Sequence, residues 1–290
     1  MQTGDPIRPL LGAATCFLLY RVGLFFLIPV GQFLGGQMIA ITVPPLLVAA
    51  IASSLAMSMF ESRRLDETGL RWVRGSGRNL LTGILLGIVG AMLAVLPAVA
   101  LGLAHFNPTG TEVSFGAMIF LPILLLCGAM GEEIAFRGFT LQYLMRGYGA
   151  WASILGMGAL FGALHAGNPG ATTLGILNTG LFGVLFGFAL LRSHDLWLPI
   201  GMHFAWNAAL PFLGVGLSGL TIKVTGWELV WQASDLWSGG SYGPEASVIT
   251  TVVIALLFVL LWKVPVCKGH AWLLDPPVDD APQSSPLPQS

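Results

Sequence analysis

Charged residues are scarce in this chain. Asp, Glu, Lys and Arg make up only 9% of its 290 residues, whereas a soluble domain carries roughly 25%. Hydrophobic residues reach 55%, and the mean hydropathy is +0.79. This composition excludes an ordinary soluble globular protein and indicates an integral membrane protein surrounded by the lipid bilayer.

Cysteines, clustered basic residues and common protease motifs are also lacking. Cys16, Cys127 and Cys267 lie far apart, which argues against a disulfide framework or a paired-cysteine metal site. The 13 Lys and Arg residues form no basic stripe, so we expect no nucleic-acid partner. The zinc-protease pattern HExxH does not occur. The apolar segments contain no aspartate, which argues against an aspartyl intramembrane protease.

Long apolar runs dominate what is present. A membrane-spanning helix needs about 20 mostly apolar residues. Eight segments approach this length: 10–34, 38–60, 80–104, 115–136, 150–167, 174–192, 197–214 and 247–264. We therefore expect an all-α, polytopic membrane helix bundle of about eight transmembrane helices. Pro44, Pro45, Pro97 and Pro122 should kink helices rather than end them, and the fourth helix should continue to about Arg146.

Arginines predict the orientation of the bundle. Loop 61–78 carries five of them, whereas loop 105–114 carries no Lys or Arg. The positive-inside rule places loop 61–78 and both termini in the cytoplasm. Segment 215–246, rich in Gly, Ser and Trp, is expected to face outward as a surface or re-entrant segment. Residues 1–268 are expected to form a single transmembrane domain, and the polar, proline-rich residues 269–290 a disordered cytoplasmic tail.

Two adjacent carboxylates, Glu132 and Glu133, follow a long uncharged run. The 19 residues from Val113 to Gly131 carry no charge. An ionised side chain deep in a bilayer costs at least about 2.5–3.5 kcal/mol and usually marks function. Glu133 and Arg137 are four residues apart and can pair on one helix face, while Glu132 points about 100° away and stays available.

Two later apolar segments repeat this four-residue spacing. Phe161 and His165 lie in GALFGALH, and His203 and Asn207 lie in HFAWN. Taken alone, each pair is explained as well by hydrogen bonding between helices. All three pairs together favour a buried site at about 113–214, with the other helices serving as packing. A carboxylate, imidazoles and an amide suit amide hydrolysis by water, because they supply a general base and oxyanion donors.

The chemistry suggests a role for each residue. Glu132 with His165 would activate the water, and His203 with Asn207 would hold the oxyanion. Glu133 and Arg137, with Phe161 beside His165, would form the supporting shell that fixes Glu132. One point conflicts with this arrangement. His203 lies only about 9 Å into its expected helix, whereas Glu132 and His165 lie about 20 Å from the cytoplasmic ends of theirs. Either the helix of His203 starts deeper in the membrane, or the helix of Glu132 ends sooner than the expected residue 146.

The three pairs resemble the motifs of a known family. GEEIAFRG (131–138) resembles the EExxxR motif of the CPBP family, FGALH (161–165) its FxxxH motif, and HFAWN (203–207) its HxxxN motif. These proteins are CAAX- and bacteriocin-processing intramembrane glutamic endopeptidases, also called type II CAAX proteases or Abi proteins. The order and spacing of the motifs agree over roughly 130–210, and every motif position is filled.

The resemblance implies an eight-helix type of fold and a glutamate-activated water. It also implies cleavage of peptide bonds near the membrane, in a catalytic cavity that opens to the cytoplasm. The expected substrate is a peptide, such as a bacteriocin precursor, or the C-terminus of a prenylated CAAX protein. The expected location is a multi-pass position in the membrane, the inner membrane if the cell is bacterial. Nothing in the sequence indicates the oligomeric state.

Other interpretations stay open at this point. We expect no cofactor, although Glu132, His165 and His203 are an alternative set of zinc ligands. A proton-coupled transporter could use the same Glu and His residues as a relay, and a non-enzymatic scaffold or immunity protein could bind a partner there. The GLSG at 216–219 resembles a serine-protease motif, but Ser218 is expected outside, far from His270 in the tail.

Overall fold

Helices account for most of the chain in the computed structural model, which describes residues 7–110 and 113–275. The helices are α1 (Ile7–Glu61), α2 (Ser76–Ala100), α3 (Phe115–Arg137), α4 (Phe139–Tyr148), α5 (Ala150–Leu164), α6 (Thr173–Ser193), α7 (Trp197–Phe212), α8 (Asp235–Ser238) and α9 (Val248–Lys263). Short 3₁₀ turns are η1 (Leu65–Thr68), η2 (His165–Gly167), η3 (Gly240–Tyr242) and η4 (Pro244–Ala246). The predicted helical fold class is confirmed.

Five helical stretches are long and apolar enough to cross a membrane. They are Ile7–Glu61, Ser76–Ala100, Phe115–Tyr148, Ala150–Gly167 and Thr173–Ser193. Helices α7 and α9 have only 16 residues each. These stretches fit a multi-pass integral membrane protein, while the count of eight spans and the cytoplasmic location of the termini stay predictions.

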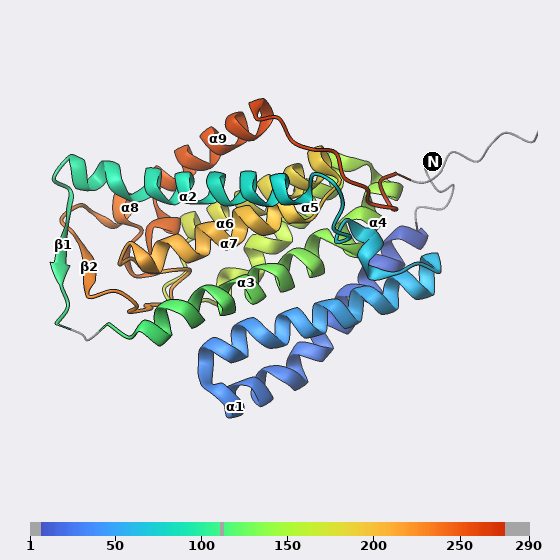
Figure 1. Ribbon diagram of the computed structural model, residues 1–290, viewed down its shortest axis with the longest axis horizontal. Helices are drawn as coiled ribbons and strands as arrows, with labels where there is room; N and C mark the ends of the chain where they lie inside the picture. Colours follow the sequence, from blue (N-terminus) through green and yellow to red (C-terminus); the bar gives the residue numbers. More distant parts are fainter. Residues whose placement is uncertain (1–6, 111–112, 276–290) are drawn as a thin grey trace, which may run out of the picture.

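Helix α1 contains two of the expected spans, joined by a sharp turn. Figure 1 shows it as a blue hairpin along one side of the bundle. The turn lies at Gly35 and Gly36, where Gly36 adopts φ 75° and ψ −171°. Only glycine adopts this backbone conformation readily, because it has no Cβ. The arms of this hairpin correspond to the expected segments 10–34 and 38–60.

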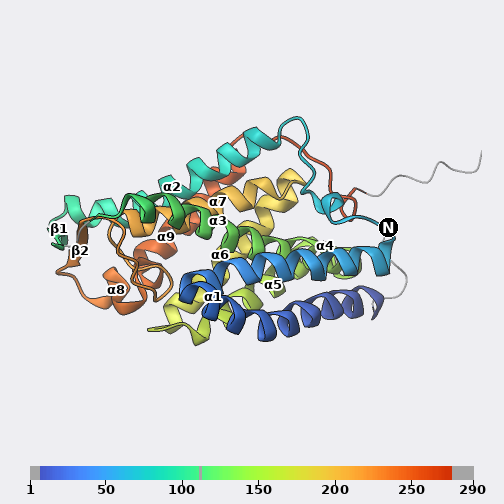
Figure 2. The ribbon, with the colours of Figure 1, turned by 60° about the horizontal axis from the view of Figure 1, so that its bottom comes forward.

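Helices α3 and α4 follow one another with a break at Gly138. The N–H of Gly138 donates to the carbonyls of Glu133 and Ile134, and the residue leaves the helical conformation with ψ −118°. The expected continuous helix to about Arg146 is therefore interrupted one residue after Arg137. Figure 2 shows α1 running beside α4. A Cβ at Gly131 would lie 2.6 Å from the backbone N of Leu46, so glycine allows α3 to approach α1 directly before Glu132.

Large apolar side chains lie on the outside of the bundle as well as inside it. Phe25 and Phe33 of α1 are 75% and 88% exposed, as suits a surface in contact with lipid. The buried residues form two groups. One is built mainly from α2, α6, α7 and α9, and the other from α1, α3, α4 and α5. The residues singled out by the sequence lie where these two groups meet.

A small sheet departs from the purely helical expectation. Strand β1 (Ala104–Pro108) pairs antiparallel with β2 (Trp227–Trp231), with Ala104 opposite Trp231 and Pro108 opposite Trp227. The sequence of β2, WELVW, is rich in aromatic and β-branched residues, which favour strands. The sheet lies at the end of the molecule opposite the start of α1 in both ribbon views (Figures 1 and 2).

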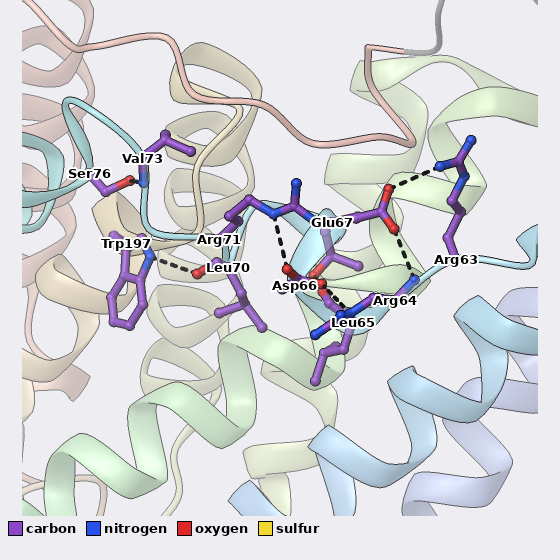
Figure 3. Close-up of polar contacts among 11 residues, drawn as sticks. Arg63, Arg64, Leu65, Asp66, Glu67, Leu70, Arg71, Val73, Ser76 and Trp197 are labelled. Atoms are coloured by element: carbon purple, nitrogen blue, oxygen red, sulfur yellow. Dashed lines mark hydrogen bonds and ion pairs between the residues drawn. The ribbon is translucent and has the colours of Figure 1, made fainter.

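The basic loop between α1 and α2 is ordered by ion pairs and supports the start of α7 (Figure 3). Arg71 Nε lies 3.0 Å from Asp66 Oδ2, and the indole Nε1 of Trp197 donates to the carbonyl of Leu70 at 3.1 Å. Gln142, in the first turn of α4, donates to the carbonyl of Thr68 at 2.8 Å. Helix α7 therefore begins level with the first turn of α4 rather than with its end. Helix α3 ends at Arg137, five residues after Glu132, and His203 lies six residues after the start of α7. Because the helix of Glu132 ends sooner than expected, the two side chains meet at one level.

Part of the expected disordered tail packs on this loop. The N–H of Trp272 donates to the carbonyl of Glu67 at 2.8 Å, and the guanidinium of Arg63 lies 3.7 Å from the centre of the Trp272 ring. Leu273 is 2% exposed. Residues 269–275 are thus held against η1, and residues 276–290 lie outside the described part of the chain.

Candidate active site

Four of the predicted site residues line one cavity inside the bundle. Glu132 of α3, His165 at the end of α5, and His203 and Asn207 of α7 all border a cavity of about 390 Å³. Pockets that bind small ligands begin at about this size. Phe161 also lines it. The fold therefore brings three motifs that are distant in sequence to a single polar space.

Glu133 and Arg137 lie behind the cavity as a buried ion pair. Their side chains are 0% and 1% exposed, and Arg137 Nη1 lies 3.0 Å from Glu133 Oε1. A second nitrogen of the guanidinium donates to the carbonyl of Gly183 at 3.0 Å. The pairing expected from their four-residue spacing is confirmed, and it ties α3 to α6.

His203 connects the two adjacent glutamates. Its Nδ1 lies 2.8 Å from Glu133 Oε1, and its Nε2 lies 3.8 Å from Glu132 Oε2. Because the carboxylate of Glu133 also accepts from Arg137, the Nδ1 of His203 acts as the donor. The ring is thereby oriented with Nε2 toward Glu132, whose side chain is 29% exposed.

His165 is oriented by a backbone group. Its Nδ1 lies 2.7 Å from the carbonyl of Phe161. A carbonyl can only accept, so Nδ1 carries a proton and the Nε2 of the neutral ring is an acceptor. The ring of Phe161 lies 4.7 Å from that of His165 and 6.2 Å from that of His203, measured between centroids. Phe161 thus separates and spaces the two imidazoles.

Aromatic rings enclose this polar group. Phe186 of α6 stacks on His203 with a centroid distance of 4.9 Å and an interplanar angle of 16°. The guanidinium of Arg137 lies 4.5 Å from the centre of the Phe161 ring and 5.4 Å from that of Phe186, within the range of cation–π attraction. Phe186 could not be predicted from the sequence, because a phenylalanine in an apolar helix carries no distinguishing pattern.

The segment 215–246, expected as an outward-facing surface or re-entrant segment, also contributes to the cavity. Ser218 and Glu245 line the cavity together with Trp206. The indole Nε1 of Trp206 donates to Glu245 Oε1 at 3.2 Å, and the hydroxyl of Ser218 donates to Glu245 Oε2 at 2.9 Å. Burial raises the pKa of the Glu245 carboxyl, while the hydrogen bonds donated by Ser218 and Trp206 act in the opposite direction. Glu245 thereby joins this segment to α7.

Helix α1 likewise does more than packing. Tyr20, Arg21 and Leu24 from its first arm line the cavity, as do Gln37 and Thr42 from its second arm. Arg21 was not predicted as a site residue, although the sequence around it carries a signal. It is the only charged residue between Arg8 and Glu61, and a charge inside an apolar span is itself a reason to expect a functional residue.

The geometry does not support the alternative zinc site. Within residues 7–110 and 113–275, no group of three His, Cys, Asp or Glu side chains is placed to hold a metal ion. Glu132 and His203 approach one another, but His165 does not complete a set of three with them.

Comparison with known proteins agrees with the motifs. No curated protein matches the chain. Residues 114–209, about one third of the chain, match the family described as "Type II CAAX prenyl endopeptidase Rce1-like". This segment contains all seven of the predicted site residues: Glu132, Glu133, Arg137, Phe161, His165, His203 and Asn207. The resemblance is confirmed, because the segment that carries the site matches the model of the Rce1-like type II CAAX prenyl endopeptidase family.

Proposed function

We propose that this protein is an intramembrane endopeptidase that hydrolyses a peptide bond with a water molecule activated by Glu132. The family match supports a protease of the CAAX type. The observation that best supports the mechanism is the position of His203. Its Nδ1 is held by Glu133 at 2.8 Å, and its Nε2 faces Glu132 at 3.8 Å. A carboxylate and an oriented imidazole thus share one cavity.

Glu132 is the general base in this proposal. Its carboxylate takes a proton from a water molecule in the cavity, and the oxygen of that water attacks the scissile carbonyl. The Nε2 of neutral His165 accepts a hydrogen bond from the same water and orients it, because its Nδ1 already donates to the carbonyl of Phe161.

His203 and Asn207 stabilise the negative oxygen that forms next. In its charged form, His203 presents an N–H from Nε2, and Asn207, four residues later on α7, presents its amide. Glu133 stabilises the positive charge on His203 through Nδ1. As the C–N bond breaks, Glu132 returns its proton to the leaving nitrogen, so that the reaction consumes one water and leaves the protein unchanged.

Glu133, Arg137 and Phe161 support these groups. Arg137 binds both Glu133 and the carbonyl of Gly183, so the α3 segment that carries Glu132 is fixed to α6. Phe161 contacts Arg137 on one side and His165 on the other. Such a buried framework holds reacting groups to within the narrow tolerance that catalysis requires.

The substrate in this proposal is a peptide chain that reaches the site from the membrane. The family favours the C-terminus of a prenylated CAAX protein, from which a tripeptide is released. Peptides such as bacteriocin precursors are the second class of substrate that the resemblance to the CPBP family implies. The cavity is proposed to open to the cytoplasm, in a multi-pass protein of the inner membrane if the cell is bacterial.

Cleavage of a farnesylated CAAX peptide by purified protein in detergent tests the function. Mass spectrometry should detect loss of the last three residues with the wild type and not with Glu132→Ala. The activity should persist after treatment with a zinc chelator. Glu228→Ala removes an exposed carboxylate of β2 and should behave as the wild type.

Three results would contradict the proposal in different ways. Cleavage by Glu132→Ala at the wild-type rate would remove Glu132 from the mechanism. Loss of cleavage in the chelator would favour a metal enzyme built on Glu132, His165 and His203. If the wild type cleaves neither this peptide nor an unprenylated one, and a cellular function survives in Glu132→Ala, the protein acts as a scaffold rather than as an enzyme.

A further inference from the structure

Arg21 lies deep in an apolar helix. It is 14 residues from Ile7, where α1 begins, and 14 residues from the turn at Gly35. At 1.5 Å per residue, it is about 21 Å from either end of this arm of α1. A guanidinium at such a depth is unfavourable unless water or an anion meets it. Its presence therefore calls for a partner.

Arg21 borders the cavity together with neighbours on the first arm of α1. Arg21, Leu24 and Ile28 are spaced as one face of a helix, and all three line the cavity. Glu132 and Asn207 line the same cavity. A cation is therefore available in the same polar space as the proposed base.

Arg21 differs from the other cavity-side arginine in having its donors available. Arg137 is fully buried, with its guanidinium bound to Glu133 and Gly183. Arg21 is exposed. Among the residues that the structure describes, no carboxylate lies within 4.0 Å of its guanidinium to form an ion pair. Its planar fork of N–H donors remains free to bind a carboxylate in two-point fashion.

A peptide substrate brings one group that suits this cation. The C-terminal carboxylate of a chain that is cut near its end has to enter the cavity with the scissile bond. Without a partner it would be an unpaired charge beside Glu132. Lipid phosphates lie at the bilayer surface, about 21 Å from Arg21 along α1. The carboxylate of the substrate is therefore the anion that the position of Arg21 favours.

We propose that Arg21 binds the C-terminal carboxylate of the peptide substrate and so restricts cleavage to bonds close to a free C-terminus. This inference rests on the proposed peptidase function, because it assigns the recognition group of that same site. It places the carboxylate on α1 and the scissile bond beside Glu132 of α3. Arg21 is thus a residue that determines specificity, distinct from the groups that act on the water.

Two peptides that differ only at the C-terminus test this role. One ends in a free carboxylate and the other in a carboxamide, and kcat/KM is measured for the wild type, Arg21→Gln and Arg78→Gln. The wild type should prefer the carboxylate by at least about tenfold, the usual size of a charge-assisted contact. Arg21→Gln should cleave both peptides within about threefold of each other. Arg78→Gln removes an exposed cation outside the cavity and should keep the preference.

The pattern of loss distinguishes recognition from a structural defect. If the wild type shows no preference, or if Arg21→Gln keeps it, the proposal is wrong. An equal fall in kcat/KM for both peptides in Arg21→Gln would also contradict the proposal. Loss of carboxylate recognition alone should leave cleavage of the carboxamide peptide unchanged. Arg21→Lys should recover part of the preference, since it restores the charge without the two-point geometry.

A binding experiment separates this proposal from the peptidase function. Fluorescent forms of both peptides are titrated by anisotropy onto Glu132→Gln and onto the double variant Arg21→Gln/Glu132→Gln. Tighter binding of the carboxylate peptide by at least about tenfold, lost in the double variant, supports Arg21 even if the wild type cleaves neither peptide. Equal binding of the two peptides to Glu132→Gln overturns it.

Discussion

His203 is held by Glu133 through a contact of 2.8 Å between Nδ1 and Oε1. The carboxylate fixes which ring nitrogen carries the proton and stabilises a positive charge on the ring. The same oxygen of Glu133 lies 3.0 Å from Arg137. The adjacent glutamates therefore differ in environment: Glu133 is buried and paired, and Glu132 is partly exposed to the cavity.

We expect Glu133→Gln to lower kcat by about 10²-fold or more, the scale of general acid–base catalysis, with little change in KM. The amide removes the charge that stabilises the protonated form of His203 and its orientation. Steady-state kinetics on a cleavable peptide measure the effect. A rise in KM with kcat unchanged would show that Glu133 serves substrate binding instead.

The buried ion pair should matter for stability, and the chain provides a matched control. Glu133–Arg137 and Arg63–Glu67 are both pairs four residues apart, but the first is 0–1% exposed and the second 15–40%. Removing one partner of a buried pair costs about 3–5 kcal/mol, whereas a surface pair contributes about 0–1 kcal/mol. Arg137→Ala should therefore lower the thermal midpoint in detergent far more than Arg63→Ala does. Similar shifts for both variants would contradict the burial of the first pair.

Asp195, in the turn before α7, should make stability depend on pH. Burial raises the pKa of this carboxyl, although donors from Trp197, Asn79 and Ser76 oppose the shift. The folded protein therefore binds the proton more tightly than the unfolded chain does. The contribution of Asp195 to stability is complete below its ordinary pKa of 3.8 and is lost as the pH rises through its folded value.

Comparison with Asp195→Asn isolates this contribution, because the variant has no carboxyl to titrate at this position. The thermal midpoint of the wild type relative to the variant should fall as the pH rises above the ordinary pKa of 3.8. A constant difference, or one that grows in favour of the wild type as the pH rises, would show that the hydrogen bonds outweigh burial.

The orientation expected from the basic loop can be tested with single cysteines. Arg74→Cys lies in the loop between α1 and α2, and Lys223→Cys lies in the segment after α7, at the opposite end of the bundle. With Cys16, Cys127 and Cys267 replaced by serine, a membrane-impermeant thiol reagent applied to intact cells should label position 223 but not position 74. The reverse pattern would invert the predicted topology.

The sequence predicted the local parts of the site well. The Glu133–Arg137 pair followed from four-residue spacing alone. The cavity shared by Glu132, His165 and His203 followed from three motifs that resemble one family. Helix geometry and motif order are encoded locally, so they could be read without the tertiary structure.

Contacts made by distant segments were not predictable in this way. Glu245 reaches the cavity because the segment after α7 folds back, and its partner Ser218 has no periodic pattern to reveal it. The break at Gly138 is accompanied by a contact between distant segments, in which Gln142 of α4 donates to the carbonyl of Thr68. The expected opening to the cytoplasm stays a prediction. Asn168 and Ser218, which line the cavity, lie at the end of the bundle away from the basic loop.

The most direct test of the central claim is the single-turnover cleavage rate of Glu132→Gln on bound peptide. Glutamine keeps the size of the side chain and removes only its ability to take a proton from water. Peptide affinity should stay within about threefold of the wild type, while the cleavage rate should fall by about 10²–10⁴-fold. Glu228→Gln, the same change in β2, should leave both values unchanged. A Glu132→Gln protein that cleaves bound peptide within about tenfold of the wild-type rate would contradict the account.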